Sequence, residues 1–166
     1  MQAQPWEDPL ALRLAAMGGV VLTGQYLGQP FVVAELAAVQ PLLRHLYDQE
    51  GFRVLVDLTA VDYPARAARF ELVYLVERQP DSYRLRVKTA LAETVAAPSL
   101  TSLFPAAAWL EREVFDMFGI RFLQHPDLRR ILLPEDWQGF PLRKEYGITQ
   151  MDNEWVRNHL GIESGQ

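Results

Sequence analysis

Two strand-length runs joined by a turn constrain the fold of this chain most strongly. The runs are RFELVYLVER (69–78) and YRLRVKTA (83–90), and the QPDS between them is a turn sequence. In the second run, apolar and basic residues alternate from Tyr83 to Lys88, so one face of the strand is expected in the core. We interpret the basic row on the other face as a solvated surface, with contact to a partner as the alternative. The two runs therefore predict an antiparallel hairpin.

Further elements are expected on both sides of this hairpin. Helices are predicted over residues 8–17, 40–50 and 105–118, and strands over 20–27, 30–34 and 52–63. Asp8 suits the cap of the first helix and Pro41 the first turn of the second, while Gly119 ends the third. In the run 52–63, the side chains at even positions from Phe52 to Leu58 are expected on one side.

These elements predict an α+β fold with one mostly antiparallel sheet covered by two or three helices. The α+β domain is expected over residues 1–122. An extended, irregular C-terminal strap and tail, expected over 123–166, would contact partner subunits. We call residues 123–146 the strap and residues 147–166 the tail.

Composition and charge exclude several functions. The chain has no cysteine, which rules out iron–sulfur ligation, a thiolate nucleophile and zinc sites of the CxxC kind. Its net charge of −5 argues against nucleic acid as the main partner, because phosphate binding needs a basic surface. The N-terminal sequence lacks a basic region followed by an apolar run, and no stretch of about 18 apolar residues occurs. Any membrane association is therefore expected to come through partners.

The helix predicted at 105–118 carries an unusual set of charges. One of its faces, centred on Val114, is apolar. Arg112, Glu113 and Asp116 lie on the opposite side, where Arg112 and Asp116 are expected to pair as an i,i+4 couple. Glu111 falls on the flank of the apolar face. A carboxylate there needs an arginine or several donors, because unpaired burial costs several kcal/mol.

An enzymatic role for this region is the weaker of two interpretations. Glu111 and Glu113 could act as an acid–base pair with His125, since paired carboxylates can divide such work. No HExxH, GxSxG, P-loop or GxGxxG motif completes such a site, and the histidines are too widely spaced to suggest a metal site. We therefore expect no catalytic, cofactor-binding or metal site, and interpret the charges as pairing within the chain or across an interface.

The strap cannot be one regular element, because Pro126 and Pro141 interrupt it near its two ends. Long irregular segments in compact domains are usually functional or bound to a partner, and alternating aromatic residues and arginines are typical of interface cores. We expect Leu133, Trp137 and Phe140 to be at least partly buried. The basic residues expected to meet acidic groups of the domain or of partner chains are Arg129, Arg130, Arg143 and Lys144.

The segment EREVFDMFGIRFLQHPDLRRILLPEDWQGFPLRKEY (111–146) resembles the signature region of the thirty-kilodalton subunit family of NADH-quinone oxidoreductase, which is respiratory complex I. Upstream runs at 55–64 and 69–76 extend the resemblance to about residues 40–146. Glu145 departs from the family, which usually has aspartate there. The signature residues, which also form the expected interface, are Glu111, Arg112, Glu113, Asp116, His125, Pro126, Asp127, Arg129, Arg130, Pro134, Trp137, Arg143 and Lys144.

The resemblance implies a non-catalytic subunit in the peripheral arm of a proton-translocating NADH-quinone oxidoreductase (NDH-1). Such a subunit binds no cofactor itself, while NAD, flavin, iron–sulfur clusters and quinone belong to the wider complex. Its implied partners are the large hydrogenase-related subunit of the quinone-reducing module and the iron–sulfur subunits. Its implied location is the cytoplasmic face of the plasma membrane, or the stromal or cytoplasmic side of thylakoids. An equivalent subunit of a complex that uses ferredoxin, coenzyme F420 or a hydrogenase remains the alternative.

His125 is the one histidine of the strap, and a histidine can change charge near neutral pH. It precedes Pro126 and lies among arginines. We interpret His125 as a structural hydrogen-bond donor, with a proton-relay role as the alternative.

Overall fold

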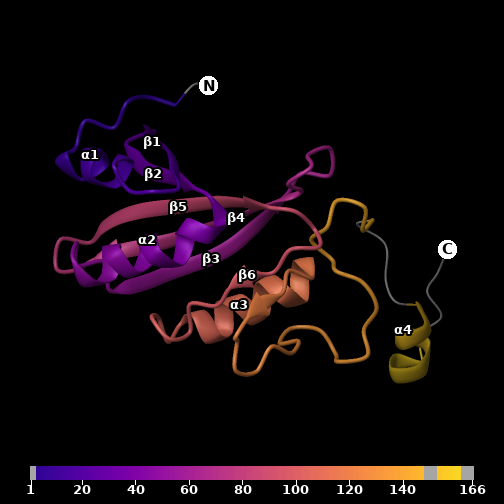
Figure 1. Cartoon of the computed structure of the whole chain (residues 1–166). Helices are drawn as coiled ribbons and strands as arrows, with labels where there is room; N and C mark the ends of the chain where they lie inside the picture. The colour runs from indigo at the N-terminus through magenta and orange to yellow at the C-terminus, as the bar shows by residue number, and fades with distance from the viewer. Residues whose placement is uncertain (1–2, 148–152, 162–166) are drawn as a thin grey trace.

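The computed structural model of the chain describes residues 3–147 and 153–161. Five strands form one mixed sheet, and two short strands pair separately (Figure 1). In chain order the elements are α1 (Pro9–Ala15), β1 (Val20–Tyr26), β2 (Gln29–Ala34), α2 (Leu36–Asp48), β3 (Val54–Asp62), β4 (Phe70–Arg78), β5 (Tyr83–Leu91), β6 (Ala97–Pro98), α3 (Ala107–Phe118), β7 (Phe122–Leu123) and α4 (Asn153–Leu160).

The sheet has the strand order β1-β2-β5-β4-β3 and is antiparallel except between β2 and β5. The predicted hairpin is confirmed, with β4 and β5 paired from Phe70 and Leu91 to Arg78 and Tyr83. β1 and β2 form a second hairpin, and Leu27 and Gly28 at its turn both have positive φ, as in a type I′ turn. The α+β prediction, with a mostly antiparallel sheet, is therefore confirmed.

The core lies on one face of this sheet. Leu72 and Tyr74 of β4 and Leu85 and Val87 of β5 are fully buried on that face, where α1, α2 and α3 contribute to the same core. Figure 1 shows α2 lying along the long strands of the sheet. Residues at alternate positions of β4 and β5 point to the opposite face, and most of them keep part of their surface exposed. The expected cover of two or three helices is found on one face.

The strand β3 does not alternate as expected. Phe52 and Leu58 are buried, but Val54 and Val56 are 39% and 37% exposed. The pairing with β4 shifts register just after Leu55, where Val56 is the extra residue of a β-bulge. Because a bulge adds one residue, it changes which residues face the core, and a simple alternation fails across it.

The helix α2 begins earlier than the sequence predicts, so Pro41 lies inside it and not in its first turn. A proline there removes one helical hydrogen bond because it has no N–H. Pro41 itself is exposed, while Val39, Leu42 and Leu46 are buried on the core side of the helix. Burial of the apolar face of α2 offsets the missing hydrogen bond. The local preferences of proline alone could not predict that the helix continues through Pro41.

The ends of α1 and α3 follow their sequence signals. Asp8 caps α1 by accepting the N–H of Leu10 at 2.8 Å, and Pro9 occupies the first turn. Gly119 ends α3 in the left-handed conformation, with φ of 75°.

After β7, residues 124–147 contain no helix or strand. The strap, drawn in orange in Figure 1, loops out beyond α3. Tail residues 148–152 and 162–166 lie outside the described residues, so the division into a domain and a strap with tail stays a prediction.

Gly119→Ala should destabilise the chain by about 3 kcal/mol, because alanine there adds steric overlap to left-handed strain. A Cβ atom at this position would lie 2.6 Å from the Phe140 ring and 2.8 Å from Nη2 of Arg143. Gly28→Ala is the matched control, since Gly28 also has positive φ but has nothing within 4 Å of the added atom. The control should cost about 1 kcal/mol in chemical denaturation. Equal losses in the two variants would contradict close packing of the strap on Gly119.

Candidate functional site

Asp116 is the centre of the contact between α3 and the strap. Its side chain is fully buried, although the helical pattern places it on the charged side of α3. Its Oδ2 accepts the backbone N–H groups of Ile131, Leu132 and Leu133 at 3.0, 2.7 and 2.9 Å. Its Oδ1 accepts a hydrogen bond from Nη1 of Arg130 at 2.6 Å. One carboxylate thus holds four consecutive residues of the strap.

The prediction that Arg112 and Asp116 form an ion pair is wrong. Arg112 instead donates from Nε to the carbonyl of Arg129 at 3.1 Å and from Nη2 to the carbonyl of Arg130 at 2.9 Å. The strap backbone offers each side chain several partners, whereas the i,i+4 pair would offer one. Both side chains therefore bind the strap and not each other.

Arg130 joins α3 to two separate parts of the strap. While its Nη1 bonds to Asp116, its Nη2 donates to the carbonyls of Trp137 and Gly139, both at 3.0 Å. Its guanidinium carbon also lies 5.2 Å from the centroid of the Phe140 ring. The planar fork of arginine suits this role because it can donate in two directions at once.

These hydrogen bonds keep Asp116 ionised. Burial alone would raise the pKa of the Asp116 carboxyl, but the N–H groups of the strap and Arg130 together lower that pKa below its ordinary value of 3.8. The folded chain therefore binds fewer protons at this group than the unfolded chain does. The stabilisation is present above the ordinary pKa and is lost as the pH falls through the lowered one.

His125 fastens the beginning of the strap to α3. Its Nδ1 accepts the backbone N–H of Asp127 at 3.0 Å, and its Nε2 lies 3.1 Å from the carbonyl oxygen of Ala108. A ring nitrogen that accepts carries no hydrogen, so we assign the hydrogen to Nε2, which donates to Ala108. This geometry agrees with a structural hydrogen-bond donor.

A second cluster, which the sequence analysis missed, holds the end of the strap. Asp62 of β3 accepts two hydrogen bonds from Arg69 at 2.8 and 2.9 Å and one from the backbone N–H of Lys144 at 2.8 Å. The bonds from Arg69 lower the pKa of the Asp62 carboxyl. Arg143 donates to Glu93 at 2.6 Å. An aspartate at an inward-facing strand position is the sequence signal for such a cluster, since a buried carboxylate needs a cation.

The remaining signature residues lie around these two clusters. Arg129 pairs with Asp127 within the strap at 2.9 Å, and both side chains are exposed. The half-buried strap residues that we expected to be covered are Leu133, Trp137 and Phe140. The half-buried signature residues are Arg112, His125, Arg130, Pro134, Trp137 and Arg143, and the exposed ones are Glu113, Pro126, Asp127, Arg129 and Lys144.

Glu111 is fully buried, but it has neither the arginine nor the several donors that the sequence analysis required. Its Oε1 accepts the backbone N–H of Leu100 at 2.6 Å, whereas its Oε2 has no partner among the described residues. Burial raises the pKa of the Glu111 carboxyl to about 7. Binding a proton thus lowers the cost of burial in place of a counter-ion. Burial, with a smaller effect of the Glu111 charge, also raises the pKa of Tyr74.

The alternative acid–base group is not assembled. Glu111 is buried beside Leu100, while Glu113 is exposed to solvent. The His125 ring is bonded to Ala108 and Asp127, and no hydrogen bond links it to either glutamate within the described ranges. Across residues 3–147 and 153–161, no cluster of three or more histidine, aspartate or glutamate side chains could hold a metal ion. None of the helices described is long and apolar enough to cross a membrane.

The fold and the site define an α+β domain that carries a C-terminal strap fixed by buried carboxylates. Residues 32–152 match the family described as "Respiratory-chain NADH dehydrogenase, 30 Kd subunit". The chain belongs to this family, so the resemblance of its signature region is confirmed.

Known relatives and structures agree with this assignment. A subunit of the NADH-quinone oxidoreductase of Hyphomonas neptunium is 45% identical over 126 residues, which cover 75% of this chain and 62% of that protein. The matched part thus spans less than two thirds of this relative. Among solved structures, the trypsin-resistant fragment (1-134) of Nqo5 matches with a TM-score of 0.64 and 32% identity, over 72% of this chain and 96% of the fragment.

A second solved structure supports the fold alone. A chain of the membrane-bound sulfane sulfur reductase, an archaeal respiratory membrane complex, matches with a TM-score of 0.74 and 21% identity. The match covers 92% of this chain and 89% of that chain.

Asp116→Asn should release the strap, because the variant keeps the shape of the side chain but loses the charge that Arg130 and three N–H groups share. Breaking such a buried pair costs about 3 kcal/mol. Limited trypsin digestion should then cut after Arg129 and Arg130 roughly 100-fold faster, because the cutting rate follows the population of the open form. Glu113→Gln, an equivalent change at an exposed position of α3, should digest like the unmodified chain. Equal cutting rates in the two variants would show that Asp116 does not hold the strap.

Glu111→Gln should change how stability depends on pH. The pKa of Glu111 rises from an ordinary 4.5 to about 7, so between these values the folded chain binds more protons than the unfolded chain. The free energy of unfolding should therefore fall by roughly 3 kcal/mol as the pH rises through this window. The variant lacks this group, so it should match the unmodified chain near pH 4.5 and exceed its stability above pH 7. If the free energies of unfolding of the variant and the unmodified chain changed with pH in the same way across this window, a buried, proton-binding Glu111 would be contradicted.

Proposed function

We propose that this chain is a non-catalytic subunit of a proton-translocating NADH-quinone oxidoreductase, and that it scaffolds the quinone-reducing module beside the large hydrogenase-related subunit. The observation that carries the proposal is the use of the signature charges. The hydrogen bonds of Asp116, Arg112 and Arg130 go to backbone groups of the same chain and, between Asp116 and Arg130, to each other. This arrangement supports a structural role, since an acid–base catalyst needs a group that can meet a substrate.

The outer side of this region supports a partner interface. Trp109 on α3 and Leu132 and Leu142 on the strap are large apolar side chains that stay exposed. Exposed large apolar side chains near arginines are typical of surfaces that bind other proteins. In this proposal, the inward carboxylates fix the shape of the strap and the outward apolar side chains contact neighbouring subunits.

The proposal assigns electron transfer to other chains. The present sequence has no cysteine to ligate an iron–sulfur cluster and no GxGxxG motif for a dinucleotide. In this proposal, NAD, flavin, iron–sulfur clusters and quinone are held by neighbouring subunits. The chain would then lie at the cytoplasmic face of the membrane, attached through the complex. It could influence quinone reduction only by supporting the shape of the large subunit.

Affinity purification from the native host, with identification of the chains that co-purify, tests this function. We expect the large hydrogenase-related subunit and the iron–sulfur subunits to be recovered together with NADH-quinone reductase activity. Recovery of this chain only as a free monomer would contradict the proposal.

A matched pair of variants tests whether the strap surface is the contact. Leu132→Glu, at a position 64% exposed on the strap, should reduce incorporation into the complex at least about tenfold, as for a moderate interface anchor. Leu12→Glu, 77% exposed on α1, is the control and should incorporate normally. Equal incorporation of the two variants would place the interface elsewhere.

His125→Gln should leave the proton-to-electron ratio unchanged. The glutamine amide can still donate to the Ala108 carbonyl and accept the N–H of Asp127, but it cannot carry a proton through a relay. Proton translocation and quinone reduction should be measured together in membranes that contain normally assembled complex. A lower ratio at normal assembly would favour the proton-relay role.

A further inference from the structure

The outward face of the sheet carries three basic side chains along β5. Arg84 donates from Nε to Glu77 at 2.8 Å, and Lys88 donates from Nζ to Glu71 at 3.1 Å. Both glutamates belong to the neighbouring strand β4, so the two outer cations of the row are neutralised within the sheet. The middle cation, Arg86, is not neutralised in this way.

Arg86 has no carboxylate opposite it. In the register of β4 and β5 it faces Leu75, because the two glutamates of β4 lie further along the strand on either side. Its guanidinium donates to the side-chain oxygen of Gln29, which is a neutral amide on β2. Within residues 3–147 and 153–161, no aspartate or glutamate forms an ion pair with Arg86. The bond to a neutral acceptor leaves its charge uncompensated.

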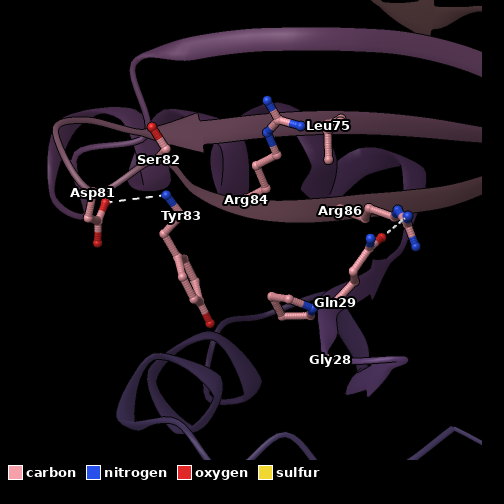
Figure 2. A pocket seen from close by; sticks show the side chains of 9 residues that line it. Gly28, Gln29, Leu75, Asp81, Ser82, Tyr83, Arg84 and Arg86 are labelled. Carbon is pink, nitrogen blue, oxygen red and sulfur yellow. Dashed lines mark hydrogen bonds between the residues drawn. The ribbon is translucent and has the colours of Figure 1, made fainter.

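Arg86 lies at a hollow with a volume of about 440 Å³. Figure 2 shows Arg86 and Gln29 meeting on one side of this hollow, and Asp81, Ser82 and Tyr83 on the other. The one carboxylate in its lining, Asp81, is already paired with Arg78 at 2.6 Å. The hollow therefore combines an uncompensated cation with an apolar wall from Leu75 and Pro30.

We propose that this hollow receives an acidic segment of a neighbouring subunit, with a carboxylate of that segment paired to Arg86. The proposal rests on the proposed function, because it needs the chain to be assembled with partners. Charge complementarity identifies the occupant, since an arginine fork binds a carboxylate through two parallel hydrogen bonds. The hollow is larger than a single carboxylate, so several residues of an extended segment fit into it. Arg84, which also lines the hollow, has a side chain that is 59% exposed, so the hollow opens to the outside, where another chain can reach it.

Arg86→Lys in the assembled complex, treated with a water-soluble carbodiimide, tests the proposal. This reagent joins an amine to a carboxylate only when the two are in direct contact. We expect mass spectrometry to find the lysine introduced by Arg86→Lys linked to an aspartate or glutamate of another subunit. The same link should be lost in Arg86→Gln, which has no amine.

Arg84→Lys is the positive control, because its lysine should be linked to Glu77 within the same chain. If this control succeeds, a lysine at position 86 that is linked only within its own chain, or not linked at all, overturns the proposal. In that case the chain is still recovered in the complex, so the proposed function survives. Recovery of the chain without partners would overturn the proposed function and this inference together.

Discussion

The buried carboxylate of Asp116 is the interaction on which the arrangement of α3 and the strap depends. It accepts three consecutive backbone N–H groups and the guanidinium of Arg130, so an irregular segment acquires one fixed path. Those N–H groups have no helix or sheet of their own to satisfy them, and buried amides without partners are costly. The charge of one aspartate thus replaces the hydrogen-bond ladder that secondary structure would supply.

The same interaction gives the strap a charged inner side and an apolar outer side. A buried ion pair is weak evidence for high stability, because desolvation offsets much of its attraction. Its value here is in conformation, since Asp116 holds four consecutive residues of the strap and Arg130 also binds the carbonyls of Trp137 and Gly139. Asp62 and Arg69 repeat this arrangement at the far end, where the backbone N–H of Lys144 is held. With the charges turned inward, apolar side chains such as Leu132 remain outside, where a neighbouring chain can cover them.

Sequence reasoning was successful where a local signal decides the structure. The β4–β5 hairpin, the Asp8 cap and the left-handed Gly119 all depend on residues close together in the chain. It failed where a residue far away along the chain decides the structure. The bulge at Val56 depends on pairing with β4, and the burial of Asp116 depends on residues 130–133 of the strap, which lie at least 14 residues away.

The candidate site divides in the same way. Its signature residues could be picked from the sequence, but their partners could not, because a helical wheel shows neighbours on one helix and nothing beyond it. Glu111 shows this limit most clearly. Its burial was expected from the flank of an apolar face, but the raised pKa that makes the burial tolerable depends on the surrounding core.

Amide hydrogen exchange of Ile131, Leu132 and Leu133 in the purified chain tests the central claim most directly. If Asp116 holds these amides, they should exchange at least about 100-fold more slowly than in an unfolded chain, although they belong to no helix or strand. Asp116→Asn should bring them close to unfolded rates while the amides of β4 and β5 remain protected. Unfolded rates in the unmodified chain, with the sheet still protected, would contradict the account.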